Sequence, residues 1–320
     1  MTVILLAFKE AEFPLDALQE IKRLFPDREV LITDERAALE SRLAEIEIVA
    51  GHVPPELLLG MTNLRWYQQW GAGADWLLNI PEAASQGWTL VNASGVHAIP
   101  ISEHILALLL AFARRLNRAV HYQERHEWKR PTDADLFELD GKTLLLIGVG
   151  AIGERTARVA AALGMRVWGM RRDPAQPADG VAAMFGPDRL LELLPQADFV
   201  ALTVPLTQET RGMIGAAELR AMKTSAYLIN IGRGGTVQTE ALVQALQQGW
   251  IAGAGLDVVE PEPLPADSPL WEMENVILTC HYSGLTPRYF ERAVKIFLDN
   301  LQRYKDGQPL HNIVDKQLGY

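Results

Sequence analysis

The chain has 320 residues, and a rule of roughly 150 residues per domain predicts about two domains. Apolar residues make up 48% and charged residues 22%, which is the composition of an ordinary globular protein. The 40 acidic residues outnumber the 30 basic ones, and the net charge of −10 makes nucleic acid and anionic membranes unfavourable partners. Cys280 is the one cysteine, so the sequence excludes an internal disulfide and a cysteine-based zinc site.

Neither a membrane span nor a targeting segment is evident. The longest apolar run, Ile105 to Ala113, is far shorter than the roughly 20 residues that cross a bilayer. The N-terminus lacks the basic start and the small-residue cleavage site of a secretion signal. Together with the single cysteine, this predicts a cytoplasmic protein. No metal site is expected.

The first hundred residues alternate between strand and helix patterns. Apolar runs of strand length cover residues 3–8, 30–32, 46–50, 64–70 and 90–91. Helical spacing covers residues 15–25, and Asp34 is a candidate cap for a helix that reaches Leu43. Strands that alternate with helices predict a parallel sheet, here without a glycine-rich phosphate-binding turn.

A second alternating block begins after Gly141. Predicted strands cover residues 143–147, 167–170, 199–204, 226–231, 252–258 and 276–279. Predicted helices cover residues 154–163, 188–194, 217–222 and 239–248, the last with Thr239 as its cap. These elements predict a doubly wound domain of about six strands. Two long helices, over residues 101–115 and 289–306, lie at either end of this block.

A glycine-rich turn links the first strand of this block to its first helix. The turn reads Gly148-Val149-Gly150-Ala151-Ile152-Gly153 and matches the dinucleotide-binding fingerprint. The first glycine permits the tight turn, the second admits a pyrophosphate, and the third lets helix and strand pack closely. A purely structural glycine turn is the alternative, but the strand before it and the helix after it favour dinucleotide binding.

The residues after the next strand bear on the choice between NAD and NADP. Sites for NAD place an acid there, whereas this strand runs into Arg171 and Arg172. Guanidinium groups match phosphate oxygens, so we expect NADP(H) to be preferred, with NAD(H) possible. The alternative is a solvated basic corner in which Asp173 binds the ribose.

Three further motifs lie at or just beyond the carboxyl ends of predicted strands of the same block. They are Asn230 to Gly235, Asp257 to Pro263, and His281 to Gly284. Ligands bind at the carboxyl ends of strands in open α/β sheets. An arginine, a carboxylate and a histidine at these ends could therefore converge on one small anion.

With these motifs the chain resembles the D-2-hydroxyacid dehydrogenase family, which includes phosphoglycerate, glycerate and formate dehydrogenases. The residues that carry the resemblance are Gly148 to Gly153, Val204 to Thr207 with Thr210, Ile231 to Gly234, Gly255 to Asp257 with Glu262, and His281 with Gly284. The resemblance covers the second block and, less specifically, the first. It implies hydride transfer between a nicotinamide and the C2 carbon of a 2-oxo or 2-hydroxy acid.

The resemblance also implies roles for individual residues. Arg233 would bind the substrate carboxylate and carbonyl oxygen, and His281 would be the general acid for reduction and the base for oxidation. Glu262 would pair with His281, because a neighbouring carboxylate favours the imidazolium form. Glu260 and Asp267 are alternative partners, and Arg233 could instead tie down a loop. The implied cofactor-binding residues are Gly148, Gly150, Ala151, Ile152, Gly153, Arg171, Arg172, Val204, Pro205, Thr210, Ile231, Gly232, Asp257 and Gly284, with Asp257 at the nicotinamide carboxamide.

The first block contributes a candidate substrate loop. Residues 70–75 resemble the family's loop that binds the substrate carboxylate, through the backbone N–H groups of Ala72 and Gly73. Glu103 and the helix after it resemble the segment through which family members form homodimers, and Trp128 is a candidate interface residue. Cys280 departs from the family pattern, which has proline before the catalytic histidine. We expect altered loop stiffness there and unchanged chemistry.

The expected fold is α/β with two doubly wound parallel-sheet domains. A Rossmann dinucleotide-binding domain, residues 99–286, is inserted in a discontinuous flavodoxin-like substrate domain, residues 1–98 and 287–320. The expected substrate is a small 2-oxo or 2-hydroxy acid, and glyoxylate, hydroxypyruvate, pyruvate and bulkier 2-oxo acids all fit. The alternative is a non-catalytic, nucleotide-sensing binding module, like the corepressors that share this fold.

Overall fold

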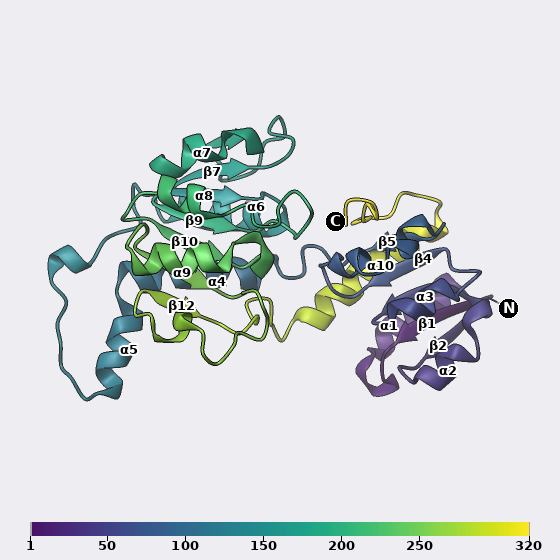
Figure 1. The fold of residues 1–320 in the computed structure, drawn as a ribbon. Helices are drawn as coiled ribbons and strands as arrows, with labels where there is room; N and C mark the ends of the chain where they lie inside the picture. Colours follow the sequence, from purple (N-terminus) through teal and green to yellow (C-terminus); the bar gives the residue numbers. More distant parts are fainter. Residues whose placement is uncertain (1, 320) are drawn as a thin grey trace. The chain divides into compact units, whose positions relative to one another are not determined.

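The computed structural model describes residues 2–319, and the chain divides into two compact units (Figure 1). Unit 1 comprises Met1–Val96 and Thr286–Tyr320, and unit 2 comprises His97–Leu285. Within the described residues, every strand pair of the two sheets is parallel. The predicted fold class, two α/β domains with parallel sheets, is confirmed.

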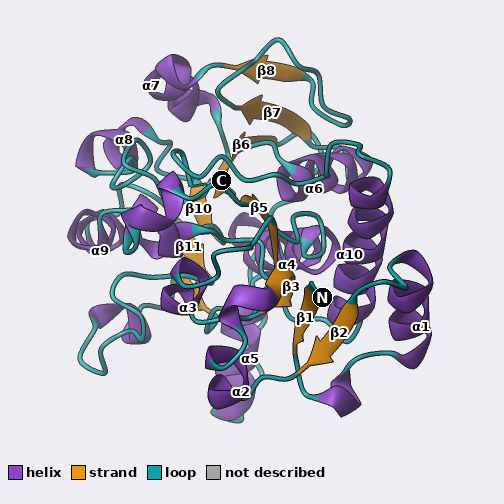
Figure 2. Cartoon of the chain, turned by 90° about the vertical axis from the view of Figure 1, so that its right-hand side faces the viewer, coloured by secondary structure: helices purple, strands orange, loops and turns teal. Residues whose placement is uncertain are grey.

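Unit 1 is built on a five-stranded sheet in the order β2-β1-β3-β4-β5, the flavodoxin-like arrangement. The strands are β1 (Val3–Ala7), β2 (Glu29–Ile32), β3 (Ile46–Gly51), β4 (Trp66–Gln69) and β5 (Thr89–Val91). The helices are α1 (Leu15–Leu24), α2 (Arg36–Glu40), α3 (Pro55–Leu59) and α10 (Tyr289–Lys305). Helices α1 and α10 pack together on one face, and α2 and α3 lie on the other (Figure 2).

The C-terminal part of the chain is joined to unit 1 by polar contacts as well as by the apolar face of α10. The Nδ2 of Asn300, on α10, donates to the side chain of Gln68 at 3.3 Å and to the His311 carbonyl at 3.2 Å. The backbone N–H of Val314 donates to the Leu90 carbonyl at 2.9 Å. The return of the chain to the first sheet therefore depends on buried hydrogen bonds that a periodicity analysis does not detect.

Unit 2 contains a seven-stranded sheet in the order β12-β11-β10-β9-β6-β7-β8. The strands are β6 (Thr143–Ile147), β7 (Arg166–Met170), β8 (Ala183–Phe185), β9 (Phe199–Leu202), β10 (Tyr227–Asn230), β11 (Gly253–Leu256) and β12 (Val276–Leu278). The helices are α4 (Ala98–Ala113), α5 (Leu116–Glu124), α6 (Ala151–Ala162), α7 (Leu190–Leu193), α8 (Ala216–Ala221) and α9 (Thr239–Gln247). Strands β7 and β8 are added on one side of β6, and strands β9 to β12 are added on the other side, so the strand order switches between β6 and β9. Ligands bind at such a switch point in open α/β sheets.

Side chains of β6 show why this strand is a continuous apolar run. Leu145 and Ile147 lie in the cluster on the face with α8 and α9, whereas Leu144 and Leu146 lie in the cluster on the face with α4 and α6. Both faces of the strand are therefore buried, as a central parallel strand requires. Helix α5 and the loop after it project away from the rest of unit 2 (Figure 1).

Several element predictions were wrong in detail. Thr239 is the first residue of α9 and not its cap, and its hydroxyl donates to the Glu260 carbonyl at 2.7 Å. Asp34 does not cap α2, because the helix begins at Arg36 after Glu35, whose N–H donates to the Thr33 hydroxyl. The sheet of unit 2 has a seventh strand, β8, which is only three residues long.

Among the residues that the structure describes, no helix has the length and apolarity to cross a membrane.

Candidate active site

The glycine-rich turn lies between β6 and α6, at the point where the strand order reverses. Gly148 has φ +101°, and a Cβ there would lie 2.9 Å from Val204 and 3.0 Å from Thr203. A Cβ at Gly153 would collide with the Gly148 carbonyl oxygen. Gly150 has open space where a Cβ would stand, and it precedes α6 without a side-chain cap. The N–H groups of the first helical turn, from Ala151 onward, are therefore suited to bind an anion.

The loop after β9 closes against this turn. The Thr203 hydroxyl donates to the Gly148 carbonyl at 2.6 Å. A Cβ at Gly232 would lie 2.7 Å from the Val204 carbonyl oxygen, so the loops after β6, β9 and β10 are in close contact. The Thr210 hydroxyl donates to the Pro205 carbonyl at 2.7 Å, which fixes the same loop. The structure thus brings together the predicted cofactor residues of three strand ends, including Ile231, which is 5% exposed.

The two predicted phosphate-binding arginines follow β7. Arg171 donates to the Val149 carbonyl at 3.2 Å, so its guanidinium lies against the glycine-rich turn. It also donates to the Asp173 carbonyl at 3.1 Å and to Gln176 Oε1 at 2.8 Å. Arg172 forms an ion pair with Glu209 at 3.1 Å. The Asp173 carboxylate accepts from the Ala175 N–H and from Gln176 within its own loop.

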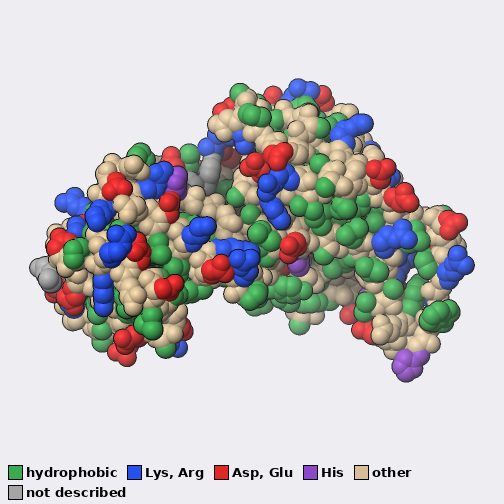
Figure 3. Space-filling view, turned by 180° about the vertical axis from the view of Figure 1, so that it is seen from behind, with side chains coloured by type: hydrophobic (Ala, Val, Ile, Leu, Met, Phe, Trp, Pro, Cys, Tyr) green, Lys and Arg blue, Asp and Glu red, His purple; other side chains and the backbone are tan. Residues whose placement is uncertain are grey.

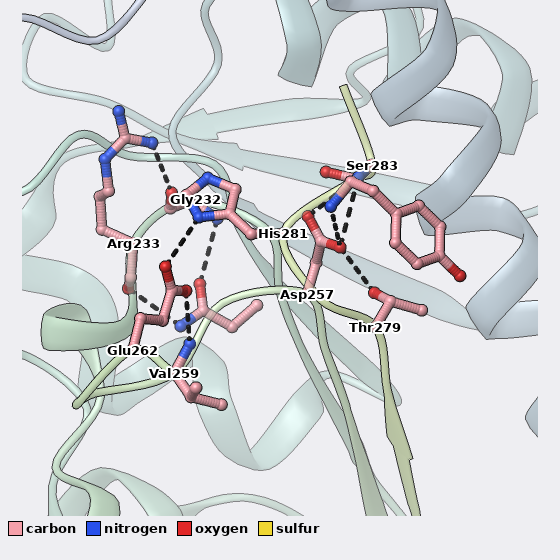
Figure 4. Close-up of polar contacts among 10 residues, drawn as sticks. Gly232, Arg233, Asp257, Val259, Glu262, Thr279, His281 and Ser283 are labelled. Atoms are coloured by element: carbon pink, nitrogen blue, oxygen red, sulfur yellow. Dashed lines mark hydrogen bonds and ion pairs between the residues drawn. The ribbon is translucent and has the colours of Figure 1, made fainter. Parts of the chain in front are cut away.

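His281 and Glu262 form a hydrogen-bonded pair (Figure 4). The His281 Nδ1 lies 2.9 Å from Glu262 Oε2, and the backbone N–H of Val259 donates to Glu262 Oε1 at 3.2 Å. Glu260, an alternative partner, instead pairs with Arg211 at 3.2 Å. The His281 side chain is 51% exposed and that of Glu262 38%, so a small molecule can reach the pair within unit 2. With Nδ1 hydrogen-bonded to a carboxylate, Nε2 is the atom that can exchange a proton with a ligand.

Arg233 lies beside this pair on the loop that follows β10 (Figure 4). Its guanidinium donates to the Gly232 carbonyl at 2.8 Å. Its own carbonyl accepts from Asn230 Nδ2 at 3.0 Å and from the Thr236 hydroxyl at 2.7 Å. Asn230 is 1% exposed and also accepts from the Gly232 N–H at 3.1 Å. Hydrogen bonds therefore hold both the backbone carbonyl and the guanidinium of Arg233.

Asp257 is buried at the end of β11, and its carboxylate receives several donors. The Thr279 hydroxyl lies 2.6 Å from Oδ1, the Tyr282 N–H 3.1 Å from Oδ1, and the Ser283 N–H 3.1 Å from Oδ2. Burial alone would raise the pKa of Asp257, but hydrogen bonds from Ser283 and Thr279 outweigh this effect and lower it. Its carboxylate is therefore ionised at neutral pH and turned toward the loop that carries His281.

A cavity of about 460 Å³ lies next to the pair. It is lined by Asp257, Val259, Glu262, Pro263, Leu264, Trp271, Leu278, Thr279, Cys280 and His281. Apolar side chains supply most of its wall, and its polar groups include Asp257, Thr279 and the carboxylate–histidine pair. A largely apolar cavity with few convergent polar groups is typical of a small-molecule site. Cys280 is an exposed free thiol in its wall.

The predicted substrate loop, in unit 1, is held through its carbonyl groups. Asn92 Nδ2 donates to the Ala72 carbonyl at 2.8 Å, and Gln69 Nε2 donates to the carbonyls of Gly71, at 3.2 Å, and of Gly73. Trp76 in turn donates to Gln69 Oε1 at 2.6 Å. These bonds fix the backbone on which the N–H groups of Ala72 and Gly73 are carried.

Sequence reasoning missed several polar residues that shape this site. Thr203, Asn230 and Thr279 each stand at or just after the end of a strand, and each hydrogen-bonds to a loop that carries a predicted site residue. A polar residue at the end of an apolar run was the available signal. That signal does not identify the hydrogen-bond partner, which for Thr203 and Thr279 comes from a different part of the chain.

Comparisons with known proteins identify relatives of this chain. The sequence model of the D-isomer specific 2-hydroxyacid dehydrogenase family, NAD binding domain, matches residues 106–283. A glyoxylate reductase of Thermococcus gammatolerans is 38% identical over 301 residues, which are 91% of this chain and 87% of that protein. A glyoxylate reductase of Korarchaeum cryptofilum is 36% identical over 281 residues, which are 86% of this chain and 83% of that protein.

Solved structures show the same likeness over the whole chain. An NADPH-dependent glyoxylate/hydroxypyruvate reductase of Sinorhizobium meliloti, in complex with NADP and sulfate, has a TM-score of 0.83 and 28% identity, with 100% of each chain covered. A D-isomer specific 2-hydroxyacid dehydrogenase family protein of Aeromonas salmonicida has a TM-score of 0.84 and 31% identity, covering 98% of this chain and 99% of that one. The chain belongs to the D-isomer specific 2-hydroxyacid dehydrogenases, a family of NAD(P)-dependent oxidoreductases.

Proposed function

We propose that this protein reduces a small 2-oxo acid with NADPH as the preferred hydride donor. The observation that carries the proposal is the His281–Glu262 pair, 2.9 Å apart, beside Arg233. These residues follow strands of the same sheet as the glycine-rich turn. They combine a proton donor, its partner and a fixed positive charge, which are the groups that reduction of a 2-oxo acid requires.

The dinucleotide would lie across the ends of β6, β7, β9 and β10. The first turn of α6 would bind its pyrophosphate, since Gly150 leaves room and has no side chain that caps the helix. The loop residues Val204, Pro205, Thr210, Ile231 and Gly232, with Asp257 and Gly284, would line the rest of its path. When bound, the nicotinamide supplies the hydride that reaches C2 of the substrate.

Arg171 and Arg172 support NADPH over NADH. Arg171 contacts the glycine-rich turn at Val149, so its guanidinium is where a ribose phosphate next to that turn would lie. Asp173, the alternative ribose ligand, has its carboxylate bound within its own loop. The relative from Sinorhizobium meliloti was solved with NADP.

The chain's own residues would supply the proton and hold the substrate. His281 would donate a proton from Nε2 to the substrate oxygen while Glu262 stabilises the imidazolium through Nδ1. Arg233 would bind the carboxylate and the carbonyl oxygen, where negative charge develops. The backbone N–H groups of Ala72 and Gly73 would bind the substrate carboxylate from unit 1.

The substrate is proposed to be glyoxylate or hydroxypyruvate, as the names of the relatives suggest.

A homodimer is also proposed. Exposed apolar side chains lie along α4, α5 and the loop that follows, namely Leu110, Leu116, Val120 and Trp128, of which Trp128 is 103% exposed. Apolar side chains are also gathered on the face of unit 2 seen in Figure 3. Such exposed surface is typical of an interface.

A panel of 2-oxo acids tests the proposal against its alternative, a non-catalytic nucleotide-binding module. The purified protein would be mixed with NADPH or NADH and with glyoxylate, hydroxypyruvate, pyruvate or 4-methyl-2-oxopentanoate. We expect NADPH oxidation to be fastest with glyoxylate or hydroxypyruvate. Tight NADPH binding without oxidation by any of the acids would favour the binding module.

A further inference from the structure

Hydrogen bonds to the buried Asp257 hold the turn that carries His281. The proposed chemistry does not explain how this turn is positioned. His281 has φ +53°, in the left-handed region, which a non-glycine residue keeps only where its surroundings hold it. Its backbone N–H donates to the Asp257 carbonyl at 2.8 Å. The next two N–H groups, of Tyr282 and Ser283, donate to the Asp257 carboxylate. The strained turn therefore depends on one buried residue.

Thr279 connects Asp257 to another part of unit 2. Its hydroxyl lies 2.6 Å from Asp257 Oδ1, a separation typical of a hydroxyl that donates to an ionised carboxylate. An ionised carboxylate can only accept hydrogen bonds. The single hydroxyl proton of Thr279 is therefore directed at Asp257, and any further partner of this oxygen must be a donor.

That further partner is His104, which lies on helix α4. Its Nε2 lies 3.0 Å from the Thr279 hydroxyl oxygen, so Nε2 carries the proton and donates it to this bond. The His104 side chain is 15% exposed, and its ring meets the ring of Tyr282 edge-on at 5.6 Å and 90°. His104 thus contacts the chain both before and after His281.

A second histidine of the same helix end supports this arrangement. His97, which precedes α4, has its Nδ1 3.0 Å from the Gly284 carbonyl oxygen. A Cβ at Gly284 would lie 2.9 Å from the same ring nitrogen. The N-terminal half of α4 therefore packs against the His281 turn at both of its ends.

We propose that His104 is a positioning residue for the reaction. It donates to Thr279, Thr279 donates to Asp257, and Asp257 holds the turn, so that the His281 ring stays where it exchanges a proton with the substrate. The inference rests on the proposed function, because it concerns the acid–base role of His281. A displaced proton donor slows the chemical step and leaves ground-state binding nearly unchanged, so kcat falls more than KM changes.

The test compares two substitutions of His104 in the full-length protein, assayed with NADPH and glyoxylate. His104→Leu removes the donor, whereas His104→Gln keeps an N–H group of similar reach. We expect the leucine variant to lower kcat about tenfold while both KM values change less than about twofold. The glutamine variant should recover most of the lost kcat.

The same comparison at Thr279 provides an independent arm. Thr279→Val removes the hydroxyl and Thr279→Ser keeps it, so we expect loss of kcat in the first and near-normal kcat in the second. The double variant His104→Leu/Thr279→Val should be no slower than the slower single variant, because both substitutions break the same chain of hydrogen bonds. This arm also decides the matter if His104→Leu does not fold.

Three results would overturn the inference: wild-type kcat in both His104→Leu and Thr279→Val, glutamine no better than leucine at His104, or fully additive losses in the double variant. The variant His281→Ala separates this inference from the proposed function. If His281→Ala is inactive while His104→Leu and Thr279→Val keep the wild-type kcat, only the positioning role fails. If His281→Ala remains active, the proposed function fails.

Discussion

Glu262 and His281 are 19 residues apart in the chain, and the structure places Oε2 of one 2.9 Å from Nδ1 of the other. Glu262 is held in turn by the backbone N–H of Val259 at 3.2 Å. A carboxylate fixed in this way orients the imidazole and leaves Nε2 for the substrate. The acid–base role proposed for His281 therefore depends on Glu262.

Replacement of Glu262 by glutamine tests this dependence. The amide keeps the size of the side chain but removes the charge that stabilises the imidazolium. We expect kcat for reduction to fall by about 10²-fold, the lower end of what general acid–base catalysis contributes. Steady-state kinetics with NADPH and glyoxylate would measure it. Glu260→Gln is the matched control, since Glu260 lies on the same loop as Glu262 but pairs with Arg211. Equal kcat values for the two variants would contradict the pairing role.

Arg171→Ala tests the proposed phosphate site. Loss of the guanidinium beside Val149 should raise KM for NADPH at least about tenfold and leave KM for NADH nearly unchanged, because only NADPH carries the ribose phosphate. The readout is the ratio of kcat/KM for the two cofactors. Arg189→Ala, which removes an exposed arginine paired with Glu192, serves as the control. An unchanged ratio in Arg171→Ala would refute the role of Arg171.

Gly150→Ala tests whether the turn binds a ligand or serves only the fold. Gly150 has φ −94°, and a Cβ there meets nothing within 4 Å, so the folded chain accommodates alanine. We expect an unchanged melting temperature and a Kd for NADPH at least about tenfold higher, because the methyl group would occupy the space proposed for the pyrophosphate. Gly87 also has open space where a Cβ would stand, so Gly87→Ala controls for the effect of a glycine-to-alanine substitution itself. Unaltered NADPH affinity would show that the turn is structural.

Asp198 gives a prediction about stability and pH. Burial alone would raise the pKa of Asp198, but hydrogen bonds from Lys223 and from the Thr143 N–H, each 2.8 Å long, lower it below its ordinary value of 3.8. A lowered pKa in the folded state means that the carboxylate stabilises the fold above pH 3.8, and that this contribution is lost as the pH falls through the lower folded value. Asp198→Asn should therefore lower the free energy of unfolding by about 1–2 kcal/mol at pH 7.

Urea unfolding at several pH values would measure this difference. The gap between the wild type and Asp198→Asn should stay constant from about pH 5 to pH 8 and shrink below the ordinary pKa of the group. A gap that widens as the medium becomes acidic would reverse the assigned sign.

The sequence predicted the elements whose signal is local. The buried run of β6 and the glycine-rich turn could be recognised because neighbouring residues define them. Strand β8 was missed because three half-buried residues contain too little pattern. The cap predicted at Thr239 was wrong because its hydroxyl bonds to the distant Glu260 carbonyl.

The candidate site likewise contains residues that local motifs predict and residues that they do not. Motifs and a family resemblance pointed to Arg233, Glu262 and His281. Of the residues that hold their loops, Asn230 bonds to the nearby Gly232 N–H, whereas Thr279 bonds to Asp257, which follows another strand. The partner of Thr279 is set by the order of strands in the sheet, which is not encoded in any single motif.

The most direct test of the central claim is a comparison of the wild type with His281→Ala, in which NADPH oxidation by glyoxylate and NADPH binding are both measured. We predict turnover in the wild type, a loss of kcat of about 10²-fold or more in the variant, and the same Kd for NADPH in both. NADPH binding without turnover in the wild type, or a His281→Ala variant as fast as the wild type, would contradict the account.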